Sequence, residues 1–167
     1  MNDSLLCECR MRLLWRESIL EEATLQTIMW EAALLLTAIN QMESSHELET
    51  TVDNRRLDRL EAKLDLALHL LARALEPAEP PIVHLVKLSA EGAEWEDPTP
   101  PEEGKALVLE LHPSEALPLA LKLPAVALAP KPGIVRVRWT GLSETLNDAL
   151  VQFVFRRHRQ AIRARAA

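Results

Sequence analysis

Proline and glycine are confined to the second part of this 167-residue chain. All 11 prolines lie between Pro77 and Pro132, and all four glycines lie between Gly92 and Gly141. These two residue types interrupt helices and mark turns. We therefore expect helices before Pro77 and short strands joined by turns after it.

The longest helix is predicted over residues 47–75, where good helix formers carry a heptad pattern. At 1.5 Å per residue this helix is about 40 Å long, too long to be covered by a small domain packed on one side. Apolar residues at e and g favour a tetramer over a dimer. A helix lying on its own domain is the alternative. The expected oligomer interface consists of Leu57, Leu60, Leu64, Ala67, Leu68 and Leu71.

Residues 5–15 alternate between apolar and polar side chains, which predicts a β-strand. A lone strand must pair with others, so we expect it to join the sheet formed by the C-terminal half. Cys7 and Cys9 share one face of this strand. Because no Cys/His pair elsewhere completes a metal site, we interpret them as small buried residues rather than metal ligands.

Two capping boxes divide the following helical region. The first, at Ser18, predicts a helix that continues to Met42, and the second, at Ser44, begins the long helix. A tight turn at residues 43–45 would join the two helices as an αα-hairpin. A single helix with a kink is the alternative.

Beyond a proline-rich linker at 76–81, the pattern predicts five or six short strands and then a helix capped by Ser143. The inward parity changes at Pro124, where we place a β-bulge. Many short strands with Pro-rich turns suggest a small barrel. The expected fold is α+β: an antiparallel β-barrel with an N-terminal helical hairpin, forming a coiled-coil stalk, and a C-terminal helix. The expected division is 1–17 (barrel strand), 18–76 (hairpin and stalk) and 77–167 (barrel and C-terminal helix).

The charge balance argues against a general nucleic-acid binder, because the net charge is −6. Contact with nucleic acid through the basic C-terminal helix is kept as an alternative. The two cysteines provide no disulfide framework. No apolar run reaches the roughly 20 residues of a membrane span, and no targeting signal is recognised. We expect a cytoplasmic protein.

The segment KLSAEGAEW at 87–95, the strands after it and the closing helix together resemble the PilZ domain, the bacterial module best known for binding cyclic di-GMP. The PilZ signature is Asp or Asn, any residue, Ser, two residues and Gly. Here Lys87, Ser89 and Gly92 occupy those positions. The resemblance covers about half of the chain. The preceding leucine-rich helix resembles the extension of an atypical PilZ subgroup that assembles as tetramers.

The family also uses an Arg-x-x-x-Arg stretch shortly before the first motif, and none lies between Leu75 and Lys87. Arg12 and Arg16 have the required spacing and lie at the end of the first predicted strand. A helical hairpin that leaves and re-enters at nearby points would allow them to reach the motif. Chance is the alternative, because the chain contains 19 basic residues.

The resemblance implies a non-enzymatic regulatory protein in cyclic di-GMP-linked processes such as pilus function, motility or virulence. We expect a homo-oligomer that contacts an unidentified signalling protein. No cofactor is expected, and cyclic di-GMP should bind weakly or not at all, because Lys87 has no hydrogen-bond acceptor for guanine. The residues at 87–92 then form a strand-to-turn junction, with Gly92 providing backbone freedom. A genuine cyclic di-GMP receptor is the alternative.

Overall fold

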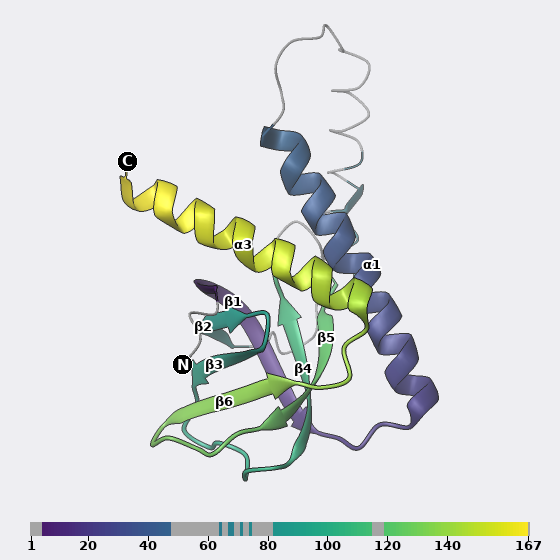
Figure 1. The fold of residues 1–167 in the computed structure, drawn as a ribbon, viewed down its shortest axis with the longest axis vertical. Coiled ribbons are helices and arrows are strands. Elements are labelled where there is room, and N and C mark those ends of the chain that lie inside the picture. The colour runs from purple at the N-terminus through teal and green to yellow at the C-terminus, as the bar shows by residue number, and fades with distance from the viewer. Residues whose placement is uncertain are drawn as a thin grey trace, which may run out of the picture.

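The computed structural model describes residues 5–47, 82–114 and 119–166, together with Leu64, Ala67, Leu68, Leu71 and Ala74. Six strands form a closed barrel in the order β1-β2-β3-β6-β5-β4, and every pairing is antiparallel. Two helices pack against it (Figure 1). This arrangement confirms the expected α+β fold with a small barrel and a C-terminal helix. The elements are β1 (Leu6–Glu17), α1 (Glu22–Glu47), β2 (Val83–Ser89), β3 (Gly92–Glu96), β4 (Ala106–His112), β5 (Leu121–Ala127), β6 (Ile134–Trp139) and α3 (Glu144–Ala166).

The N-terminal strand β1 closes the barrel by pairing with two neighbours. Its first part, from Leu6 to Arg12, pairs with β2, and its second part, from Arg12 to Glu17, pairs with β4. Twelve residues are long enough to serve both partners. Without β1, both β2 and β4 would present unpaired edges. The strand predicted from the alternation in residues 5–15 therefore joins the sheet formed by the C-terminal strands, as expected.

Inward-facing aliphatic and aromatic side chains fill the barrel. Leu107, Leu109 and Leu111 of β4 are all buried, as the alternation in that strand predicts. The larger buried rings include Trp95 from β3 and Phe153 from α3. The inward positions of β1 include Cys7, which is buried, and Cys9, which is half-buried. Both cysteines are free thiols.

The β-bulge expected at Pro124 is wrong. Strands β4 and β5 keep one uninterrupted register, in which Pro124 lies opposite Val108. The inward parity also continues past the proline, because Ala125 and Ala127 are buried. Two alanines are small enough to be overlooked as core residues, and the more hydrophobic Val126 on the opposite parity suggested a change of face. The barrel interior, rather than hydrophobicity alone, decides which parity points inward.

Both predicted boundaries of the first helix are also wrong. The backbone N–H of Ser18 donates to the carbonyl of Ala106 at 3.0 Å, so the chain is still following β4, and α1 begins only at Glu22. At the other end, α1 runs through the expected turn at 43–45 and reaches Glu47. The rest of the expected hairpin lies largely outside the described residues. Five of its positions are described, each in helical conformation: Leu64, Ala67, Leu68, Leu71 and Ala74.

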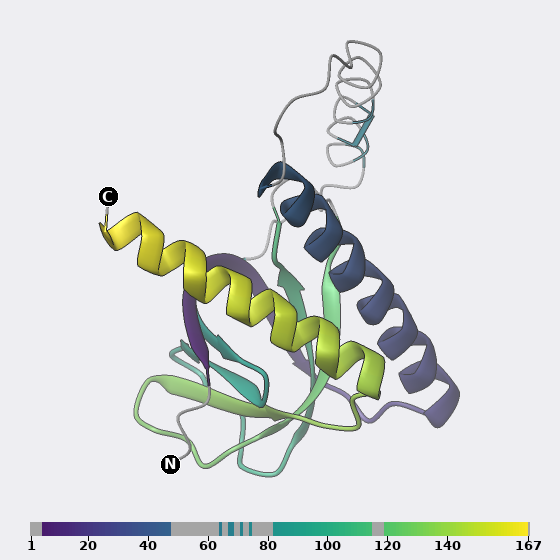
Figure 2. The same ribbon diagram turned by 45° about the horizontal axis from the view of Figure 1, so that its top comes forward.

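The two helices cover the barrel and contact each other (Figures 1 and 2). The hydroxyl of Ser143 accepts a hydrogen bond from the N–H of Leu146 at 3.3 Å, which confirms the predicted cap of α3. Helix α3 packs over β1, whereas α1 packs on β5. The buried stripe of α3, formed by Leu146, Leu150 and Phe153, is the one expected from the helical spacing.

A polar clamp holds the C-terminal end of α1 against α3. Glu43 contacts Arg157 at 2.8 Å and Arg156 at 3.5 Å, and all three side chains are mostly buried. Arg157 also donates to the carbonyl of Pro113 at 2.8 Å. One turn earlier, Asn40 is buried and its amide donates to the carbonyl of Ala149 at 3.0 Å. These contacts explain why α1 continues beyond residue 42.

We predict that Glu43→Ala lowers the free energy of unfolding by about 2 kcal/mol, because it removes charge-assisted bonds to two mostly buried arginines. Urea unfolding of the full chain measures this loss. Glu31→Ala, on the exposed side of the same helix, is the matched control and should change stability by less than about 0.5 kcal/mol. Equal effects of the two substitutions would contradict the clamp.

Candidate functional site

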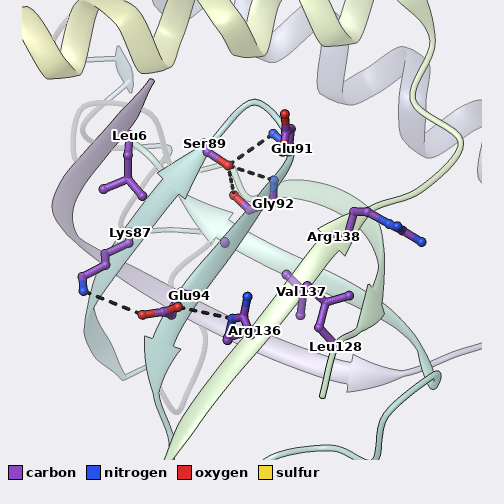
Figure 3. Close-up of a pocket in the computed structure, with 11 residues that line it drawn as sticks. Leu6, Lys87, Ser89, Glu91, Gly92, Glu94, Leu128, Arg136, Val137 and Arg138 are labelled. Carbon is purple, nitrogen blue, oxygen red and sulfur yellow. Dashed lines mark hydrogen bonds and ion pairs between the residues drawn. The ribbon is translucent and has the colours of Figure 1, made fainter. Parts of the chain in front are cut away.

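The turn between β2 and β3 is built around the hydroxyl of Ser89. This oxygen accepts hydrogen bonds from the N–H groups of Glu91 at 3.2 Å and Gly92 at 3.1 Å. The hydroxyl also lies 3.1 Å from the carbonyl oxygen of Gly92, to which it donates (Figure 3). A serine hydroxyl has one donor and two acceptor positions. All three are therefore used within the turn, and Ser89 has a structural role here.

The turn is fixed to the end of β6. Trp139 donates its backbone N–H to the carbonyl of Glu91 at 2.9 Å and its indole N–H to the carbonyl of Ser89 at 3.1 Å. A Cβ atom on Gly92 would lie 2.0 Å from the carbonyl oxygen of Val137. Gly92 has no positive φ, so the expected reason for a glycine was wrong. The position requires glycine because two backbones approach closely there.

A row of alternating charges crosses four strands beside this turn. Lys87 Nζ lies 3.7 Å from Glu94 and 4.0 Å from Glu8, and Arg136 Nε lies 3.5 Å from the other oxygen of Glu94 (Figure 3). The strand register places each pair directly opposite. Such partly exposed pairs contribute little to stability. Their main consequence is that the positive charge of Lys87 is already balanced by two carboxylates.

An open depression of about 220 Å³ lies over this row and the turn. Its cationic lining includes Arg136 and Arg138, neither of which the sequence analysis singled out. Arg138 is exposed and makes no ion pair within the described part of the chain (Figure 3). The alternation in IVRVRW carries the signal, because both arginines share the parity that points away from the buried Val135 and Val137.

The structure does not bring Arg12 and Arg16 to the turn. Glu8 faces Lys87 across β1 and β2, whereas Arg12 faces Val83, four residues further along. That offset corresponds to about 13 Å. Arg16 lies still further away, and its guanidinium contacts Glu110 at 3.1 Å. The three motif positions Lys87, Ser89 and Gly92 are close together, and the arginine pair is separate from them.

The predicted oligomer interface is only partly described. Leu57 and Leu60 lie outside the described residues. Leu64 and Leu71 are 60% and 49% exposed in the single chain. Ala67 is also exposed and Leu68 is half-buried.

The six-stranded antiparallel barrel, its C-terminal helix and the serine-centred turn define a PilZ-type domain. The chain belongs to the family described as "atypical PilZ domain, cyclic di-GMP receptor", whose model matches residues 34–166. No curated protein matches the chain.

Among solved structures, the chain is similar to a pathogenic protein from Xanthomonas campestris, described as a tetrameric PilZ domain self-assembled through an unusual helical bundle. The two are 29% identical, with a TM-score of 0.79 and coverage of 97% of this chain and 92% of that one. The inhibitor of motility MotI/DgrA from Bacillus subtilis matches 50% of this chain and 44% of its own, at 22% identity and a TM-score of 0.37. The PilZ domain of CeSA from a cellulose-synthesizing bacterium matches 47% of this chain and 82% of its own, at 19% identity and 0.33.

We predict that Gly92→Ala costs about 3 kcal/mol or more of stability, because its Cβ would force β3 away from the backbone of β6. The matched control is Gly104→Ala. Gly104 has a φ of +83° but open space around it, so this variant should lose only about 1–2 kcal/mol. Thermal unfolding of both variants provides the comparison. A smaller loss at Gly92 than at Gly104 would contradict the close-approach explanation.

Proposed function

We propose that this protein is a non-enzymatic, homo-oligomeric PilZ-type regulator that acts through protein contacts, with a degenerate nucleotide site. The observation that carries this proposal is the charge row at the motif, in which Lys87 is flanked by Glu8 and Glu94. Its setting would be a cyclic di-GMP-linked process such as pilus function, motility or virulence. That setting is supported by the family match to residues 34–166.

The chemistry of the motif disfavours cyclic di-GMP. This ligand is a dianion that carries two guanines, so its site needs cations for phosphate and acceptors for guanine N–H groups. An ammonium group offers three donors and no acceptor, and Lys87 is already paired with carboxylates. Glu91 adds a negative charge to the lining of the same depression. Ser89 is fully used by its own turn.

A cyclic di-GMP receptor is the second candidate function. It is supported by the family description and by the two arginines, Arg136 and Arg138, in the lining of the depression. Of these, Arg138 is available to a phosphate without breaking an ion pair among the described residues. The carboxylates beside Lys87 and Arg136 oppose this second candidate.

Nucleic-acid contact through α3 has less support. Two arginines of this basic helix, Arg156 and Arg157, are directed at Glu43 and are mostly buried. Their charge is therefore largely unavailable at the surface of the helix. The acidic net charge of −6 opposes the same role.

Self-association is supported by the exposed leucines and by the similar protein. Leu64 and Leu71 expose about half or more of their surface in a single chain, although both belong to the predicted oligomer interface, which we call the predicted seam. The Xanthomonas campestris protein, which covers nearly the whole chain, is described as tetrameric. None of the helices in the described residues is long and apolar enough to cross a membrane.

We predict that calorimetry shows no measurable heat when the full chain is titrated with micromolar cyclic di-GMP. The missing acceptor at position 87 alone removes a charge-assisted bond worth about 1.5–3 kcal/mol. Lys87→Asn restores an acceptor and should increase affinity, whereas Lys122→Asn on β5 should not. Micromolar binding by the unmodified protein that disappears in Arg136→Ala, Arg138→Ala would instead establish the receptor.

We also predict that light scattering gives a mass of four chains. Replacing Leu64 and Leu71 together with serine should break the assembly, because each buried, unsatisfied hydroxyl costs about 1–3 kcal/mol in every chain. Ile19→Ser is the control, since Ile19 is 95% exposed and far from the predicted seam in sequence. A monomer at micromolar concentration would refute the oligomer.

A further inference from the structure

Arg10 and Arg12 occupy adjacent outward positions on β1, and neither is explained by the nucleotide motif. Both side chains are exposed. Within the described residues neither makes an ion pair or a side-chain hydrogen bond, unlike Arg16, which contacts Glu110. Two neighbouring guanidinium groups on one strand thus have no ion-pair partner among the described residues.

Exposed aliphatic side chains surround these two arginines. Leu85 lies directly opposite Arg10, and Val83 lies directly opposite Arg12, in the register of β1 and β2. Leu14 follows on the same face of β1. Leu14, Val83 and Leu85 are 48%, 52% and 56% exposed. We call these five residues, Arg10, Arg12, Leu14, Val83 and Leu85, the β1–β2 face.

The nearby carboxylates do not cancel the charge of this face. On one side Glu8 is paired with Lys87, and on the other Glu110 is paired with Arg16. His112 lies opposite Arg12 on β4. Burial, aided by the charge of Arg12, lowers the pKa of His112, which favours the neutral form of this side chain. Among the residues that the structure describes, no carboxylate pairs with the two positive charges of this face, on a chain whose net charge is −6.

We propose that the β1–β2 face is a docking surface for an acidic, amphipathic segment of a partner protein. The aliphatic side chains of the face would pack on the apolar side of that segment, and the carboxylates of the segment would pair with Arg10 and Arg12. This proposal rests on the proposed function as a protein-interaction module, and it names the chemistry of the partner. The face shares no residue with the lining of the depression, and its nearer pair, Arg10 and Leu85, lies two residues along the strands from Glu8 and Lys87.

Charge favours a short protein segment over an anionic membrane. Screening limits interactions between exposed charges to about 8 Å at physiological salt, so a segment seated on this face is influenced mainly by the two arginines. A membrane is an extended plane that faces many other groups of the molecule at once. The acidic net charge then opposes its approach.

The test uses the full chain and a fluorescent synthetic amphipathic helix of Leu and Glu residues, with a Leu/Lys helix as its charge-reversed counterpart. Fluorescence anisotropy should show binding of the Leu/Glu helix and a loss of affinity with added salt. Arg10→Glu, Arg12→Glu should weaken binding by at least tenfold. Leu85→Ser should weaken it several-fold, because it removes apolar contact area. Arg10→Gln, Arg12→Gln provides a milder variant, and circular dichroism checks that each protein is folded.

Arg159→Glu, Arg165→Glu is the matched control, because it changes the net charge equally at exposed positions of α3. An equal loss in this control would overturn the proposal, as would equal binding of both helices or binding of neither. Binding of the unmodified chain to phosphatidylglycerol vesicles, lost in the Arg10/Arg12 variant, would replace the protein segment with a membrane. These variants leave the depression and the predicted seam intact, so calorimetry and light scattering judge the proposed function independently.

Discussion

Strand β1 makes the barrel possible, because it hydrogen-bonds to β2 along one half of its length and to β4 along the other. Three strands, β3, β6 and β5, connect β2 to β4 the other way round, so β1 supplies the closing pairs on both sides. This pairing puts Glu8 beside Lys87 and Arg16 beside Glu110. It also determines where α1 begins, since the chain leaves β4 only after Ser18. The charge row and the β1–β2 face both follow from this single strand.

The outer surface of the barrel is divided by how its charges are paired. Around the turn at Ser89, positive and negative groups alternate across four strands and largely cancel. Further along β1, Arg10 and Arg12 have aliphatic neighbours in place of carboxylates. The same strand thus offers a balanced surface near Glu8 and a cationic surface without paired carboxylates, among the described residues, at Arg10 and Arg12 in its middle.

Helix α1 connects the barrel to the leucine-rich segment that follows it. Its clamp to α3 through Asn40 and Glu43 lies within about two turns of Glu47, the last described residue of the helix. Trp30 and Leu34 leave a large apolar area exposed on the opposite side of α1. This exposure distinguishes the single chain from the fully covered helix of an ordinary globular core.

Alternation and periodicity in the sequence determined the type of most elements and much of the core. They gave the strands at Leu107–Leu111 and Val135–Trp139, the buried stripe of α3 and the cap at Ser143, because these signals depend only on local geometry. The motif positions Lys87, Ser89 and Gly92 were also found from sequence. Tertiary structure decided where the elements begin and end and what the individual residues do. Pairing with β4 overrode the capping signal at Ser18, contacts with α3 carried α1 through Ser44, and the barrel interior selected Ala125 over Val126. Only the register could show that Gly92 faces the backbone of β6, that Glu94 lies between Lys87 and Arg136, and that Arg12 lies far from the turn. Each of these depends on which strands become neighbours, a property that residues distant in sequence acquire only when the barrel closes.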